Sequence, residues 1–152
     1  KHCFTRPPIP YSSMIFHSEL LLGYCALLRV SLGVMYLAHS VALKLLTFGL
    51  AGTAGYFESI GLPGWLAYAT FAAEAVGGAM LLLGIHARWV ALALIPALLG
   101  AIIWAHAGNG WVFNAPGGGW EYPLYLIVLS VAQFMLGDGL YALRPSKYFA
   151  RS

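Results

Sequence analysis

The chain has 152 residues, of which 61% are hydrophobic and 9% are charged. A soluble domain usually carries charge on about a quarter of its residues, so this chain has too little polar surface for a fold surrounded by water. Its eight basic residues give a formal net charge of +3, but they are scattered and form no basic stripe for nucleic acid. The composition therefore predicts a small integral membrane protein that is surrounded mostly by lipid.

The two ends of the chain differ from its middle. Residues 1–18 contain Pro7, Pro8 and Pro10, and proline lacks the backbone N–H that a helix interior needs. This segment predicts an extended N-terminal arm. Residues 144–152 form a short basic tail, which leaves residues 19–143 as the membrane domain.

Apolar stretches in this domain predict four membrane-spanning helices. About 20 apolar residues in a helix cross the ~30 Å hydrocarbon core of a bilayer. The predicted spans are residues 19–46, 65–83, 89–107 and 120–143, with Pro96 as a kink in the third. The expected fold class is all-α, an antiparallel four-helix bundle in the membrane.

Three connections join the predicted spans. Residues 47–64 are too rich in glycine to continue a helix, and residues 84–88 form a turn so short that its neighbours must be antiparallel. Residues 108–119, rich in glycine and asparagine, predict an irregular loop on the outer side.

Basic residues near the ends of the spans predict the orientation, because cytoplasmic loops are enriched in lysine and arginine. Six basic residues fall on one side, and Lys44 alone falls near the other. We therefore expect both termini and the 84–88 turn in the cytoplasm. The six are Lys1, Arg6, Arg88, Arg144, Lys147 and Arg151.

Small residues recur at four-residue spacing on the two middle spans, where they would let helices approach closely. They are Ala69, Ala73 and Gly77 on one span, and Ala93, Ala97, Ala101 and Ala105 on the other.

Ionisable residues inside the predicted spans indicate where polar chemistry lies. Each costs about 2.5–3.5 kcal/mol at the centre of a membrane helix, so such residues usually face the bundle interior and have partners. At ~1.5 Å per residue, His39 lies ~10 Å and Glu74 ~13 Å below the outer boundary, which makes them expected partners. Deep ionisable residues also mark proton or ligand paths. His39 and Glu74 are therefore the candidates for a proton-linked or quinone-linked site.

The other ionisable residues predict a structural charge network of Arg29, Lys44, His106 and Glu121. Arg29 lies ~25 Å below the outer boundary and could extend to the cytoplasmic one. Lys44, His106 and Glu121 lie near the outer boundary, and we expect Lys44 and Glu121 within reach of a salt bridge.

No residue pattern predicts a metal, a haem or a catalytic residue. Cys3 and Cys25 have neither CxxC spacing nor metal-ligand companions. His106 alone would supply one axial ligand, and the sequence has no haem-attachment motif. No nucleophile is paired with a base, so the sequence names no catalytic residue.

Taken together, these residues resemble the DoxX family of four-helix bacterial membrane proteins over roughly residues 25–140. The motifs that carry the resemblance are Arg29-x3-Gly33-x5-His39-x4-Lys44, Gly61-Leu62-Pro63, Glu74-x2-Gly77-Gly78, Leu81-Leu82-Leu83-Gly84 with Arg88, His106, and Gly118-Gly119-Trp120-Glu121-Tyr122-Pro123. The resemblance implies a multi-pass protein of a bacterial or archaeal cytoplasmic membrane. Related proteins are membrane subunits of thiosulfate:quinone oxidoreductase and of a mycobacterial complex with a superoxide dismutase and a sulfurtransferase.

The sequence leaves three functions open. The first is a subunit of a redox or respiratory-type assembly, with a quinone-facing pocket lined by His39, Glu74 and aromatic residues. The second is a structural accessory subunit without chemistry that stabilises a neighbouring membrane protein. The third is a small transporter, which the absence of an evident inverted repeat makes the weakest. The resemblance favours an accessory subunit over an enzyme by itself, with other membrane protein subunits as its partners, and a quinone is the cofactor that the first function implies.

Overall fold

The computed structural model describes residues 11–146, with side chains from Ser18 onward, and this part of the chain is helical. Cys3 and the basic residues of both predicted terminal segments lie outside the described residues, apart from Arg144. The helices are α1 (Tyr11–Leu37), the π-helical segment η1 (Ala38–Thr47), α2 (Gly49–Ser59), α3 (Trp65–Leu83), α4 (Ala87–Gly100), the π-helical segment η2 (Ala101–His106), the 3₁₀ turn η3 (Ala107–Asn109) and α5 (Glu121–Leu136).

The first helix is longer than predicted. It begins at Tyr11, so the second half of the predicted extended arm is helical. Residues 11–18 contain neither proline nor glycine, and nothing in them interrupts a helix. The helix continues into η1, which ends at Thr47, one residue beyond the predicted end.

The glycine-rich segment 47–64, predicted as an irregular connection, contains the helix α2. The glycines at its borders adopt positive φ angles, +69° at Gly49 and +83° at Gly61, which only glycine adopts at low cost. Those inside α2 have helical geometry. The Thr53 hydroxyl donates to the carbonyls of Gly49 and Lys44 and joins α2 to η1.

The two middle predictions agree closely with the structure. Helix α3 has the predicted bounds, and it ends where Gly84 takes φ +69°. The predicted 84–88 turn precedes α4, which η2 and η3 extend to Asn109. Three helices are long and apolar enough to cross a membrane: Ser18–Thr47, Trp65–Leu83 and Ala87–Asn109.

The last helix is shorter than the predicted span 120–143. It ends at Leu136 because Gly137 takes φ +97°, which no α-helix accommodates. The chain beyond it crosses the 84–88 turn, where the backbones of Gly84 and His86 bond to Arg144. The Asp138 carboxylate accepts hydrogen bonds from the backbone N–H groups of Arg88 and Ser146 and fixes this crossing.

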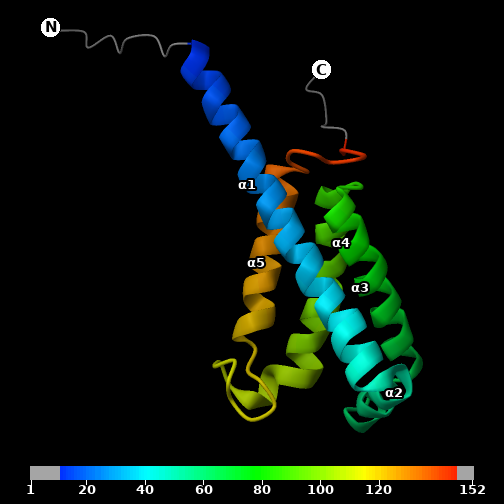
Figure 1. Ribbon diagram of the computed structural model, residues 1–152. Helices are drawn as coiled ribbons and strands as arrows, with labels where there is room; N and C mark the ends of the chain where they lie inside the picture. Colours follow the sequence, from blue (N-terminus) through cyan, green and yellow to red (C-terminus); the bar gives the residue numbers. More distant parts are fainter. Residues whose placement is uncertain (1–10, 147–152) are drawn as a thin grey trace, which may run out of the picture.

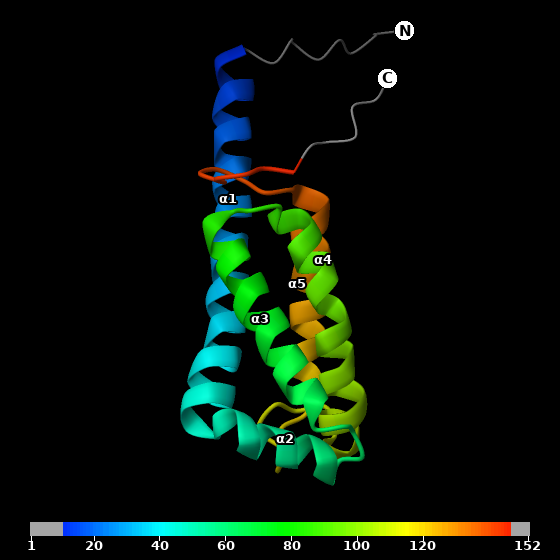
Figure 2. The same cartoon turned by 90° about the vertical axis from the view of Figure 1, so that its right-hand side faces the viewer.

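The long helices pack side by side, and those adjacent in sequence run in opposite directions (Figure 1). Helix α2 lies across one end of them, as Figure 2 shows most clearly. The 84–88 turn and the segment after α5 lie at the opposite end. The core between the long helices consists of Leu32, Tyr36, Leu81, Ala87, Ala91, Leu94, Leu98 and Leu126.

Helices α1 and α3 approach each other closely at Gly33 and Gly78, whereas Gly77 of the predicted small-residue ridge is buried against Leu94 of α4. A Cβ atom on Gly33 would lie 2.9 Å from the carbonyl oxygen of Gly78. Ala69 and Ala73 are exposed instead. The two helix backbones therefore touch where neither residue has a side chain.

Large apolar side chains are exposed along every long helix. Examples are Leu27 and Val34 on α1, Val76 on α3, Ile103 on η2 and Val128 on α5. A water-soluble protein rarely exposes so continuous an apolar surface. This surface suits contact with lipid.

Candidate functional site

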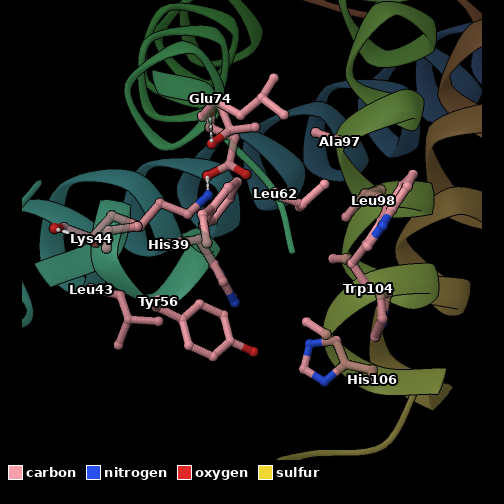
Figure 3. A pocket seen from close by; sticks show the side chains of 18 of the residues that line it. His39, Leu43, Lys44, Tyr56, Leu62, Glu74, Ala97, Leu98, Trp104 and His106 are labelled. Carbon is pink, nitrogen blue, oxygen red and sulfur yellow. Dashed lines mark hydrogen bonds and ion pairs between the residues drawn. The ribbon is translucent and has the colours of Figure 1, made fainter. Parts of the chain in front are cut away.

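A cavity of about 720 Å³ lies between the long helices, at the end covered by α2 (Figure 3). All five α-helices and both π-helical segments contribute to its lining. Most of the lining is apolar, from residues such as Leu43, Phe57, Leu66, Leu98 and Leu126. The polar groups are few, and they come from Tyr36, His39, Lys44, Thr53, Tyr56, Thr70, Glu74, Trp104, His106 and Tyr122.

The π-helical segments carry much of this polar lining. His39 and Lys44 lie on η1, and Trp104 and His106 lie on η2. A π-helix is rare because its hydrogen bonds skip one residue more than in an α-helix, and it is found frequently at functional sites. Its presence on two walls of one cavity identifies this cavity as the candidate site.

The strongest polar contact in the cavity is an ion pair between Lys44 and Glu74. The Lys44 Nζ atom lies 2.6 Å from Glu74 Oε2, and the two side chains are 18% and 11% exposed. The pair joins η1 to α3. Each charge would be costly alone in so apolar a setting, and the pairing removes most of that cost.

This pairing corrects the prediction that His39 is the partner of Glu74. The His39 Nδ1 atom lies 3.3 Å from the carbonyl oxygen of Met35, and its ring stacks on Tyr122 with centroids 5.8 Å apart. The predicted positions assumed a regular α-helix. The wider turn of η1 begins at Ala38 and changes the direction in which the following side chains point.

The predicted salt bridge between Lys44 and Glu121 is also wrong. Glu121 lies in the first turn of α5, where its Oε2 atom accepts a hydrogen bond from the backbone N–H of Phe113 at 3.2 Å. It thereby fastens the 108–119 loop, while Lys44 is occupied by Glu74.

His106 lies on the far wall of the cavity from η1 (Figure 3). Its Nδ1 atom is 2.9 Å from the carbonyl oxygen of Gly118. The Asn109 amide donates hydrogen bonds to the carbonyls of Ala105, Gly117 and Gly118. One end of the 108–119 loop is therefore tied to the helix that carries His106.

Arg29 lies away from the cavity, where the segment after α5 crosses α1. Its side chain is 3% exposed, and its Nη2 atom donates to the carbonyl oxygen of Leu140 at 3.2 Å. The guanidinium lies beside Gly84, and a Cβ atom added to Gly84 would overlap with the guanidinium. Arg29 thus extends toward the end of the bundle that carries the 84–88 turn, and its guanidinium is buried there beneath the segment after α5.

The four residues predicted as one charge network are consequently separate. Within residues 18–146, Arg29, Lys44, His106 and Glu121 make no hydrogen bond or ion pair with one another. Each instead fastens a different segment: the chain after α5, helix α3, and two parts of the 108–119 loop.

The described residues contain no group of three or more His, Cys, Asp or Glu side chains that could hold a metal ion. Cys25 is a buried free thiol on α1 that faces the Leu136 carbonyl, outside the cavity. The polar side chains that line the cavity can therefore act as acids, bases and hydrogen-bond partners.

Sequence reasoning identified His39, Lys44, Glu74 and His106 and missed other polar lining residues. Tyr56 was missed because α2 was not predicted as a helix, although an aromatic residue in a glycine-rich segment is a signal for a covered site. Thr70 and Trp104 lie on predicted spans, where only their side-chain polarity distinguishes them from lipid-facing neighbours.

The fold and site define an all-helical membrane protein with an apolar internal cavity that contains one ion pair. Residues 24–107 match the DoxX family, and this range is more than half of the chain. The chain therefore belongs to the DoxX family and is a multi-pass membrane protein.

One curated relative is the Bacillus subtilis (strain 168) protein named "Putative oxidoreductase CatD". It is 32% identical over 119 residues, which cover 78% of this chain and 83% of the relative. No solved structure matches the chain significantly.

Proposed function

We propose that the chain crosses a bacterial or archaeal cytoplasmic membrane four times, with both termini and the 84–88 turn inside. The proposal counts α5 as the fourth span, although its 16 residues extend only ~24 Å. The exposed apolar side chains on α5 support this, and a short helix is accommodated by local thinning of the bilayer. The asymmetry of the basic residues gives the orientation.

Reporter fusions test this topology. A reporter that is active only in the cytoplasm should be active when fused after Ser152 or within residues 84–88, and inactive within residues 108–119. A reporter that is active only outside should give the reverse pattern. An external C-terminus would refute the proposed orientation.

We propose further that the chain is the membrane subunit of a redox assembly and that its cavity holds the ring of a membrane quinone. The cavity carries this proposal, because its apolar walls enclose the Lys44–Glu74 pair and two imidazoles. Small-molecule sites are mostly apolar with a few placed polar groups. The name of the Bacillus subtilis relative gives it an oxidoreductase role, which agrees with this class of function.

The residues present fit such a ring. A quinone is a flat apolar ring with two oxygen atoms, and when bound it supplies the chemistry of electron transfer. The apolar side chains of this chain would contact the ring, and the two oxygen atoms of the ring would face His39 and His106. Lys44 and Glu74 would supply and accept protons beside it.

Binding of a short-chain quinone such as decylubiquinone tests the proposed occupant. Trp104 lines the cavity, so a bound quinone should quench its fluorescence in a saturable way. Ala97→Phe should fill part of the cavity and weaken binding about tenfold, a change of 1.4 kcal/mol. The control Ala93→Phe alters an exposed position of the same helix and should leave binding unchanged. Quenching that does not saturate, or equal effects of both variants, would contradict the proposal.

The second candidate function is a structural subunit without chemistry. It is favoured by one observation: Glu74 is already paired with Lys44, in a contact that would by itself hold α3 against η1. In that case the assembly would need the shape of this chain and not its titrating groups.

Glu74→Gln separates the two functions, because glutamine keeps the shape of glutamate but cannot titrate. Its amide oxygen still accepts a hydrogen bond from the Lys44 ammonium, so the variant is disturbed less than one with leucine at this position. If the chain handles protons, the variant should assemble normally and lose proton-coupled turnover in the intact complex. Normal assembly with full turnover would remove Glu74 from the chemistry and leave the structural function.

A further inference from the structure

We infer that the cavity binds the reduced, hydroxyl-bearing form of its ring ligand more tightly than the oxidised, carbonyl-bearing form. This inference rests on the proposed quinone-binding function and adds to it the redox state that the site selects. The observation behind it is the way backbone carbonyls fix the two imidazoles that line the cavity.

His106 shows the effect most clearly. Its Nδ1 atom lies 2.9 Å from the Gly118 carbonyl oxygen. A carbonyl oxygen can only accept a hydrogen bond, so Nδ1 must carry the hydrogen. A neutral imidazole has one N–H group, and the Nε2 atom of His106 therefore presents a free lone pair.

The side chain of Asn109 holds the Gly118 carbonyl, which determines that Nδ1 of His106 carries the hydrogen. Its Nδ2 atom lies 2.9 Å from the Gly118 oxygen and 3.0 Å from the Gly117 oxygen. Gly118 adopts φ +74°, a conformation that needs glycine, and turns its carbonyl toward both side chains. Asn109 is thus a positioning residue that acts on the ligand through Gly118 and His106.

His39 is held in the same state on another wall. Its Nδ1 atom faces the Met35 carbonyl oxygen at 3.3 Å, so this nitrogen also carries the hydrogen. Its ring is stacked on Tyr122 with an interplanar angle of 20°, which restrains its orientation. The Nε2 atom of His39 is then a second hydrogen-bond acceptor.

The two hydrogen-bond acceptors in the cavity wall, the Nε2 atoms of His39 and His106, complement a ligand that has two hydrogen-bond donors. The hydroxyl groups of a hydroquinone can donate to both imidazoles, whereas the carbonyl oxygens of a quinone would meet lone pairs. The other polar groups do not discriminate. The indole N–H of Trp104 only donates, and the oxygens of both forms can accept from it. Tyrosine and threonine hydroxyls donate or accept, and the Lys44–Glu74 pair offers a donor and an acceptor together.

The first test measures which nitrogen of each imidazole carries the hydrogen, and it needs no ligand. The full chain is labelled with ¹⁵N-histidine, reconstituted in lipid bilayers and measured by solid-state NMR at about pH 8.5. This pH lies above the ordinary pKa of an imidazole. His39→Leu and His106→Leu assign the signals. We expect protonated Nδ1 and bare Nε2 at both residues, and protonated Nε2 would overturn the inference.

The second test compares affinities for decylubiquinol and decylubiquinone at the same pH under anaerobic conditions. Two hydrogen bonds should favour the quinol about tenfold or more, and each of His39→Leu and His106→Leu should reduce that preference about fivefold. Asn109→Leu should reduce the preference for quinol. In the NMR spectrum of this variant, His106 should be a mixture of rings with the hydrogen on Nδ1 and rings with the hydrogen on Nε2. The control His86→Asn removes an imidazole outside the cavity, and asparagine accepts the positive φ of that position.

The outcomes separate this inference from the proposed function. Binding of both forms with equal affinity, or a quinol preference that survives in the double His39→Leu, His106→Leu variant, overturns only the inference. Binding of neither form overturns the quinone-binding function and the inference together.

Discussion

Glu74→Leu is expected to destabilise the folded protein by about 3–5 kcal/mol, because it leaves the Lys44 ammonium buried without its counter-ion. Lys44→Leu should do the same to the Glu74 carboxylate. The double leucine variant should be close to the wild type, since it removes the ion pair and its desolvation cost together. The free energy of unfolding in detergent, followed by circular dichroism, measures all three.

The comparison has a matched control in Glu19→Leu, which removes an exposed carboxylate and should change stability by less than about 0.5 kcal/mol. If the effect of the double variant equals the sum of the two single effects, Lys44 and Glu74 are not coupled. The ion pair would then not hold η1 against α3.

Adding a side chain at the crossing of α1 and α3 should have a comparably large effect. In Gly33→Ala the new Cβ atom would lie 2.9 Å from the Gly78 carbonyl oxygen and 3.0 Å from the Leu82 backbone nitrogen. Backbone atoms cannot rotate away as a side chain can, so the helices must separate. We expect a loss of about 1–3 kcal/mol and little folded protein for Gly33→Leu.

Gly23→Ala is the control for this prediction, because Gly23 lies on the same helix and a Cβ atom added there would meet nothing within 4 Å. Alanine is the better helix former by about 1 kcal/mol, so this variant should be neutral or slightly stabilised in the same unfolding measurement. Equal losses at both positions would show that the crossing is not the cause.

The sequence predicted those features that depend on local composition. Residues 65–83 were predicted with the bounds of α3 because this largely apolar stretch lies between the glycine-rich segment 47–64 and the turn that begins at Gly84. The boundaries of α2 and α5 were not predicted, because they depend on glycine φ angles that composition does not reveal. Gly52 and Gly55 are helical within α2, whereas Gly137 ends α5.

Of the residues that line the cavity, the sequence named His39 and Glu74 as site candidates, and it assigned Lys44 and His106 to a structural network. Depth along a helix correctly indicated that Glu74 needs a partner in the bundle interior. It did not indicate which partner, because that depends on rotation about the helix axis, and η1 changes the rotation between His39 and Lys44. The flexible stem of Lys44 brings its ammonium to Glu74, and His39 turns to Tyr122 instead.

The position of the cavity has a consequence for how its occupancy is measured. Its walls are helices with exposed apolar outer surfaces, and α2 lies across one end of these helices. A ligand with an apolar tail partitions into the bilayer, so the free ligand in equilibrium with the cavity is set by moles of ligand per mole of lipid. Diluting a sample with buffer should hardly empty the site, whereas adding lipid should. Apparent dissociation constants from preparations with different lipid-to-protein ratios become comparable only when expressed as mole fractions in the membrane.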